Sequence, residues 1–334
     1  MSVRITPIGA QGEHQAETLR SGGVRGNYVH RIARETVVVL YTDRWTLWFD
    51  SGEGTPVETR TFSGSGAVRI EIDPLSAHAI QNDGGSDLHL FAAGNVNDRE
   101  ARVLVELPAR IAGVDGTRRG WIAMIKDDGP SIEARFCTSD DDLLALFNSC
   151  AVITIDIPIG LPENGPRSCD HHARRFLGRR ASSVFPAPLR PLLALREFSD
   201  ANRVARDLQK RGISKQGWAI VPKVAQIDRL LQRHRNLRGR VYEVHPEVSF
   251  AAWNDHEAIA ESKHSKEGLA ARRALAVAHF GEEALPSTPK YAAENDVLDA
   301  LAALWTAERI RDGRARELGD SRADLTGLPM RIVY

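Results

Sequence analysis

The sequence predicts two domains in series, a small all-β, sandwich-like domain over residues 1–108 and an α/β domain over residues 109–334. The chain has 334 residues, which is roughly the length of two domains. Its first part is a series of short strand-like segments, whereas strand-like and helical segments alternate from residue 109 onward. Such alternation is typical of a sheet covered by helices.

The first domain is predicted from short strands separated by turns. β-branched and aromatic residues are concentrated in residues 36–43 and 44–50, and the sequence SGEG at 51–54 is typical of a turn. Strands at this spacing favour a sandwich or a barrel. The residues do not indicate a chemical role here, so binding of a protein partner is one role left open. Further strands are predicted at 57–62, 67–72, 87–92 and 101–107.

The second domain is predicted to begin with a hairpin of residues 109–115 and 121–126, joined by a glycine-bounded turn. Apolar residues on helical spacing predict a helix over 140–150. The nearly continuous apolar run at 151–157 is typical of a strand buried on both faces. A further strand is predicted at 240–245. The other predicted helices are 169–177, 223–234, 268–280 and 294–311.

Charge is distributed unevenly, although 44 Lys and Arg residues balance 44 Asp and Glu residues over the whole chain. Residues 157–240 contain 18 basic and 6 acidic residues, and the segments on either side are acidic on balance. We expect this segment to be a basic helical insertion in the second domain. Such a segment is either an ordinary solvated helical surface or a surface that binds the phosphate backbone of nucleic acid.

Composition excludes several classes of protein. A chain with 42% hydrophobic and 26% charged residues is neither disordered nor a coiled coil throughout. No apolar run approaches the roughly 18 residues of a membrane-spanning helix, and the first residues lack the apolar core of a signal peptide. We therefore expect a cytoplasmic protein without a membrane partner. Three cysteines without a Cys-x-x-Cys pair do not favour a disulfide framework or a zinc site.

Four aspartates are placed where a carboxylate is costly unless something compensates its charge. Asp115 and Asp156 each end an apolar strand, and Asp296 and Asp299 are three residues apart on one face of the helix 294–311. For each residue alone, a turn, a helix cap or a solvated helix start is the alternative. Together they favour an oxygen-rich site for Mg²⁺ or Mn²⁺. Two such ions, about 3.5–4 Å apart, can activate water and stabilise a leaving oxygen.

Eight segments of the second domain occur in the order found in a known family. They are GVDGTRRGW (113–121), IDIPIGLP (155–162), RSCDHHARRFLG (167–178), SSVFPAP (182–188), SKQGWAIVPKVAQID (214–228), EVHPEVSF (243–250), SKHSKEGLAARR (262–273) and NDVLDALAALWTA (295–307). On these segments, residues 109–334 resemble the domain of unknown function 429 (DUF429) family, a group of predicted nucleases with an RNase H-like fold. The last segment also resembles the end of the RuvC resolvase.

The resemblance implies a mixed sheet whose first strand carries Asp115 and whose fourth carries Asp156. It brings Asp296 and Asp299 to the same pair of metal ions and adds Glu243 as an assisting catalytic acid. Glu247 is a second candidate at the end of that strand.

Other residues of the matching segments are assigned to the substrate by hypothesis. Lys215, within SKQGW, is expected to act in catalysis and in substrate binding, with an ordinary turn lysine as the alternative. His245 is expected to position water or substrate, unless it is a core or capping histidine. The cations expected to contact phosphate oxygens are Arg167, Arg174, Arg175, Lys215, Lys223 and Arg272.

The function expected from these observations is metal-dependent cleavage of nucleic acid. The segment GVDGTRRGW also resembles the phosphate-binding hairpin of actin-like and sugar kinases, so a phosphotransferase or ATP-binding protein is the first alternative. A module that binds nucleic acid or protein without catalysis is the second.

Overall fold

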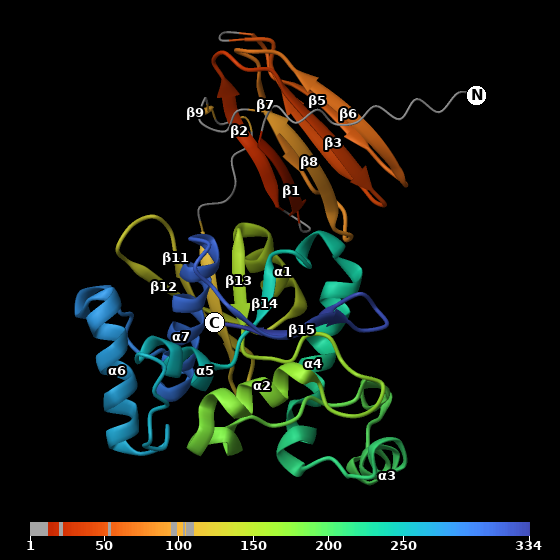
Figure 1. The fold of residues 1–334 in the computed structure, drawn as a ribbon. Coiled ribbons are helices and arrows are strands. Elements are labelled where there is room, and N and C mark those ends of the chain that lie inside the picture. Colours follow the sequence, from red (N-terminus) through yellow and green to blue (C-terminus); the bar gives the residue numbers. More distant parts are fainter. Residues whose placement is uncertain (1–12, 20–22, 53–54, 95–98, 103, 105–109) are drawn as a thin grey trace. The chain divides into compact units, whose positions relative to one another are not determined.

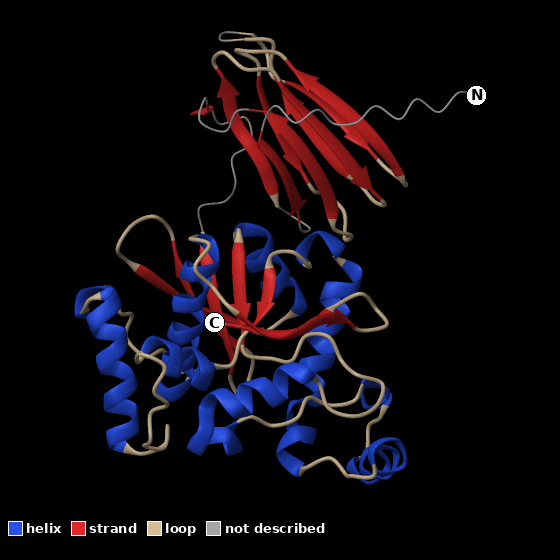
Figure 2. Ribbon diagram, in the orientation of Figure 1, coloured by secondary structure: helices blue, strands red, loops and turns tan. Residues whose placement is uncertain are grey.

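In the computed structural model the chain divides into two compact units, residues 1–107 with 235–240 and residues 108–234 with 241–334. The structure describes residues 13–19, 23–52, 55–94, 99–102, 104 and 110–334. The predicted boundary between residues 108 and 109 lies outside these described residues. Figures 1 and 2 show strands in the first unit and a sheet with surrounding helices in the second.

The first unit contains two antiparallel sheets, with strand orders β1-β8-β3-β6 and β5-β4-β7-β2-β9. Val37, Val39 and Leu90 of one sheet share a buried core with Trp45 and Ile80 of the other, which makes the unit a sandwich. The strands are β1 (Glu13–Leu19), β2 (Val24–His30), β3 (Glu35–Tyr41), β4 (Trp45–Phe49), β5 (Glu58–Phe62), β6 (Gly66–Ile72), β7 (Ala77–Gln81), β8 (Leu88–Gly94) and β9 (Arg99–Ala101).

The predicted N-terminal strands correspond to β3, β4, β5, β6 and β8, whereas β1, β2 and β7 were not predicted. The strands β2 and β7 lack a clear alternation of polar and apolar residues because some of their buried positions are polar. Arg25, His30 and His78 are all buried around the buried carboxylate of Glu35. The strand predicted at 101–107 falls largely on residues outside the described part of the chain.

The second unit is built on a five-stranded mixed sheet with the order β12-β11-β10-β13-β14. The strands β10, β11 and β12 are antiparallel neighbours, and β13 and β14 run parallel to β10. The side of β10 that faces β13 is therefore the point where the sheet changes from antiparallel to parallel. The strands are β10 (Ile111–Gly116), β11 (Trp121–Lys126), β12 (Ile132–Cys137), β13 (Val152–Ile155) and β14 (Val241–Glu243).

Helices surround this sheet (Figure 2). They are α1 (Asp140–Ser149), α2 (Ser168–Leu177), α3 (Phe198–Gln209), α4 (Lys215–Arg233), α5 (Pro246–Trp253), α6 (Lys266–Phe280) and α7 (Glu294–Arg311), and a C-terminal hairpin of β15 (Glu317–Ala323) and β16 (Pro329–Val333) follows α7. No helix of the described residues is long and apolar enough to cross a membrane.

Helix α7 packs closely on β10, and Gly113 makes this approach possible. A Cβ atom at Gly113 would lie 2.0 Å from the backbone nitrogen of Leu304 and 2.3 Å from the carbonyl oxygen of Ala300. Ile111 and Ile122 of the sheet share a buried core with the apolar residues of α7. This contact fixes the first turns of α7, which carry Asp296 and Asp299, relative to the strand that carries Asp115.

The fold therefore agrees with the coarse prediction of an all-β part followed by a mixed sheet flanked by helices. Most predicted elements of the second unit are present within two residues of their predicted bounds. Helix α4 is the main exception, because it begins at Lys215 after the capping residue Ser214 and continues through Pro222. The elements β12, α3, α5, β15 and β16 were not predicted.

Candidate carboxylate site

Three aspartates from three elements meet at one edge of the mixed sheet. Val114 pairs with Ile155 across the parallel strands β10 and β13, so Asp115 and Asp156 follow side by side. The Asp156 backbone N–H donates to the Val114 carbonyl oxygen at 3.0 Å, and the two carboxyl groups are close enough to shift each other's pKa. Asp299 of α7 is 1% exposed and Asp115 is 6% exposed.

Burial and mutual repulsion raise the pKa values of these aspartates. Burial raises the pKa of Asp115 well above its ordinary value, and the charges of Asp156 and Asp299 raise it further. Burial also raises the pKa of Asp156, although His245 and Lys263 oppose this. The pKa of Asp299 is raised to about 6 by burial, against the effect of Lys263. Such shifts are typical of carboxylates that lack a full set of compensating cations.

Lys263 supplies the positive charge closest to Asp299. Its Nζ donates to Asp299 Oδ2 at 2.6 Å. Although burial opposes it, the charge of Asp299 raises the pKa of the ammonium above its usual range. Sequence reasoning did not single out Lys263, because it lies in a short irregular segment before α6 where no periodicity shows which side chain points inward.

Asp296 lies beside this group, but its oxygens are occupied. One accepts hydrogen bonds from the Ala293 backbone N–H at 3.2 Å, and the other from the Asn295 amide at 2.7 Å. The carboxylate therefore closes the start of α7, as the helix-start alternative expects. Its charge still raises the pKa of Asp115, so Asp296 is electrostatically part of the site.

The donor chemistry of the site fits a divalent cation. The groups that meet here are carboxylates, the ligands that Mg²⁺ and Mn²⁺ prefer. Buried Asp299 Oδ1 has no hydrogen-bond partner among the described residues. In that same part of the chain, no group of three or more His, Cys, Asp and Glu side chains is arranged to hold a metal ion. The Lys263 ammonium, paired with Asp299, provides compensating charge in this arrangement.

Glu243 and Arg167 form an ion pair with each other rather than contacting a metal ion or a substrate. Two guanidinium nitrogens of Arg167 each donate to a Glu243 oxygen at 2.7 Å, and the Ile159 backbone N–H donates to the same carboxylate at 2.7 Å. Arg167, which is 3% exposed, also pairs with Asp170 at 2.6 Å. These placements do not support the catalytic role expected of Glu243 or the phosphate contact expected of Arg167.

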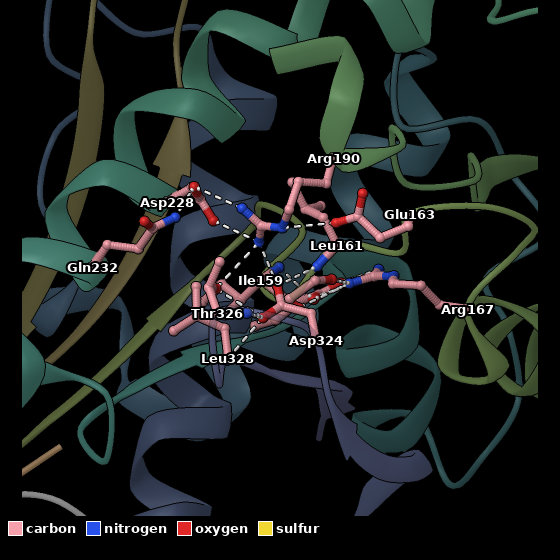
Figure 3. Close-up of polar contacts among 12 residues, drawn as sticks. Ile159, Leu161, Glu163, Arg167, Arg190, Asp228, Gln232, Asp324, Thr326 and Leu328 are labelled. Carbon is pink, nitrogen blue, oxygen red and sulfur yellow. Dashed lines mark hydrogen bonds and ion pairs between the residues drawn. The ribbon is translucent and has the colours of Figure 1, made fainter. Parts of the chain in front are cut away.

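A second ion-pair network fixes the loop that follows Asp156 (Figure 3). The Arg190 guanidinium pairs with Asp324 and, at 3.0 Å, with Asp228 of α4. Asp324 accepts from the Leu161 backbone N–H at 2.8 Å. Loop 157–163 is thereby held between α4 and the turn of the C-terminal hairpin, which restricts the position of Asp156.

Arg272 is also an internal cation. Its side chain is fully buried, and one guanidinium nitrogen donates to both oxygens of Glu247 at 2.8 Å. Another donates to the Gly268 carbonyl oxygen at 3.0 Å. A side chain in this position does not reach a phosphate in solvent, so the contact expected of Arg272 is not supported, and Glu247 is occupied by it.

The remaining predicted cations are Lys223, Arg174, Arg175 and Lys215, and they differ in burial and in their partners. Lys223 Nζ donates to the Gly120 carbonyl oxygen at 2.5 Å and lies 4.2 Å from the Trp121 ring centroid, and burial lowers its pKa while Asp115 and Asp296 oppose this. Arg174 donates to the Val184 carbonyl oxygen at 2.5 Å and lines a cavity of about 590 Å³. Arg175 and Lys215 are exposed.

His245 caps α5 and lies beside the aspartates. Its Nε2 is 3.3 Å from the Ser183 carbonyl oxygen, and its positive form would lower the pKa of Asp156. With Asp156 and Lys263, it lines a second cavity of about 410 Å³. The structure thus brings Asp115, Asp156, Asp299 and Lys263 together, with Asp296, His245 and Lys223 around them.

Comparison with known proteins identifies one family. The family described as "Protein of unknown function (DUF429)" matches residues 113–323, and the N-terminal part lies outside the match. No curated protein matches the sequence.

Two solved structures are similar to parts of this chain. The capsular polysaccharide assembling protein CapF from Staphylococcus aureus is 18% identical, with 27% of this chain and 26% of that chain covered and a TM-score of 0.25. The dTDP sugar isomerase from Desulfovibrio desulfuricans G20 is 14% identical, with 30% and 72% covered and a TM-score of 0.25. This chain therefore spans about a quarter of the length of CapF, and similarity at these TM-scores assigns neither fold nor function.

Proposed function

The chain belongs to the DUF429 family, and from that premise we propose that it is a metal-dependent phosphodiesterase that cleaves nucleic acid. We propose with it that the second unit has an RNase H-like topology. Three antiparallel strands followed by two strands parallel to the first support this topology. Asp115 lies on the first strand of the sheet and Asp156 directly follows the fourth.

The observation that carries the proposal is the meeting of Asp115, Asp156 and Asp299. Three carboxyl groups from two strand ends and a helix meet at one place, where Asp115 and Asp299 are buried, Asp156 is half-buried and Lys263 pairs with Asp299. Burying carboxylates that repel each other costs free energy that folding alone does not require. Perturbed carboxyl groups gathered in this way are typical of functional sites.

The chemistry that the site offers follows from its residues. A divalent cation bound there would acidify a water molecule and stabilise the leaving oxygen of a phosphodiester. Asp115, Asp156 and Asp299 would hold that cation, with Asp296 adding negative charge from the start of α7. Lys263 holds an ammonium group at the edge of the site, where it can donate to a non-bridging phosphate oxygen.

The test is a cleavage assay with DNA, RNA and hybrid oligonucleotides in Mn²⁺ or Mg²⁺. We expect Asp115→Asn and Asp299→Asn each to lower the rate by at least about 100-fold, since each removes a charge that compensates the cation. Asp128→Asn, in an exposed turn, is the matched control and should retain activity. Full activity in either site variant would overturn the proposal, whereas ATP binding without cleavage would favour a phosphotransferase.

A further inference from the structure

The cavity of about 410 Å³ beside Asp156 is the feature that reaches beyond the carboxylate site. Its volume is within the range of about 300–1,000 Å³ that is usual for small-molecule sites. It has room for a single nucleotide but not for a helical duplex. Because Asp156 and Lys263 form part of its wall, an occupant would lie directly against the proposed catalytic groups.

Arg180 places a positively charged group in the wall of this cavity, and this group is only weakly paired. The side chain is 25% exposed, and its contact with Glu247 is long at 3.7 Å. Both Glu247 oxygens accept shorter hydrogen bonds of 2.8 Å from Arg272. The buried Arg180 Nε has no hydrogen-bond partner within the described part of the chain. The exposed part of this guanidinium, whose only ion-pair contact among the described residues is long, is well suited to a phosphate oxygen.

His245 lies in the same wall. In the neutral ring, the contact of Nε2 with the Ser183 carbonyl oxygen places the proton on Nε2 and leaves Nδ1 as an acceptor. Nδ1 is buried and has no partner among the residues that the structure describes. The ring therefore lies in the cavity wall with an unpaired acceptor nitrogen that is itself covered by protein atoms.

Apolar residues complete the wall. Phe185 lines the cavity and is 47% exposed, and Pro158 and Ile220 line it as well. An exposed aromatic ring next to a cation is a surface on which a nucleobase stacks, and such stacking tolerates any base. A cation for phosphate and a ring for a base therefore occur in one cavity.

We propose that this cavity binds a nucleoside monophosphate group, with its phosphate at Arg180 and Lys263 and its base at Phe185. The proposal rests on the proposed function, because it makes this group the terminal nucleotide of the cleaved strand. The enzyme then acts at chain ends, or on short phosphodiesters, and does not cut within a continuous strand.

Binding is tested by calorimetry on the full-length protein in EDTA, with adenosine 5′-monophosphate, adenosine and inorganic phosphate as probes. We expect the monophosphate to bind more tightly than either fragment. Arg180→Gln should weaken its binding by about tenfold through loss of a charged hydrogen bond, and Phe185→Ala should weaken it severalfold. Arg179→Gln, at an exposed neighbour outside the cavity wall, should bind as the unsubstituted protein does.

The proposal is overturned if the Arg180→Gln and Phe185→Ala variants have the melting temperature of the unsubstituted protein and bind the monophosphate equally tightly. It is also overturned if the unsubstituted protein does not bind the monophosphate. Equal binding of phosphate alone would overturn the nucleoside part. Circular single-stranded DNA distinguishes chain-end action, since we expect it to resist cleavage in Mn²⁺ while its linear form is degraded. Monophosphate binding together with full activity of Asp299→Asn would refute the proposed function but leave the cavity assignment standing.

Discussion

Aspartates take opposite roles in this fold, as those at the ends of β10 and β13 show when they are compared with Asp170 and Asp324. Asp324 and Asp170 are compensated by arginines and backbone N–H groups. Asp115 instead faces other carboxylates, and its pKa is raised by burial and by their charges. A buried carboxyl group without such compensation lowers the stability of the protein.

Asp115→Asn should therefore stabilise the protein in EDTA at pH 8. A carboxyl whose pKa is higher in the folded than in the unfolded state binds more protons when folded, so its contribution to stability is lost as the pH rises through the folded value. We expect a gain on the order of 1–3 kcal/mol at pH 8 and little change at pH 4. Denaturant unfolding at the two pH values measures the free energy of unfolding. An equal loss of stability at both pH values would contradict the prediction.

Lys263→Met should have the opposite effect at pH 8. Asp299 would lose its ion pair of 2.6 Å, and an uncompensated buried carboxylate costs on the order of 1–3 kcal/mol. Added Mn²⁺ should then raise the melting temperature of this variant more than that of the unsubstituted protein, because it replaces the missing charge. Lys266→Met, at an exposed position at the start of α6, is the control. An unchanged melting temperature in EDTA would show that Lys263 does not neutralise the site.

At the scale of elements, the close packing of α7 on β10 determines where the helix presents Asp299. Gly113→Ala would place a Cβ atom 2.0 Å from the Leu304 backbone nitrogen, and neither backbone can yield without moving the helix. We expect a loss of at least about 3 kcal/mol, at the upper end of overpacking. Gly129→Ala, in a turn with nothing within 4 Å of the added Cβ, should be neutral. Urea unfolding compares them, and equal stability would refute the packing argument.

Elements were predictable from the sequence where apolar residues follow one clear period. This holds for β10, β11, β13, α1 and α7, which bury a continuous apolar face or body. Helix α5 was missed because it is short and buried on nearly all sides, so its residues show no alternation of polar and apolar character. In α3, small residues provide the buried face, namely Ala201 and Ala205.

At the scale of the whole molecule, the basic segment 157–240 has less free charge than its composition indicates. Arg167 and Arg190 neutralise buried carboxylates of the same unit. The sequence shows the number of arginines but not these partners, which lie as far as 134 residues away along the chain. The strand-end aspartates were easier to place, because neighbouring parallel strands bring their ends to one edge.

The most direct test of the carboxylate site is a Mn²⁺ titration at pH 7.5, followed by the electron paramagnetic resonance signal of free Mn²⁺. We expect the unsubstituted protein to remove Mn²⁺ from solution and Asp128→Asn to match it. Asp115→Asn and Asp299→Asn should each bind at least about tenfold more weakly, because each removes a negatively charged ligand. Equal Mn²⁺ binding by all four proteins would contradict the site.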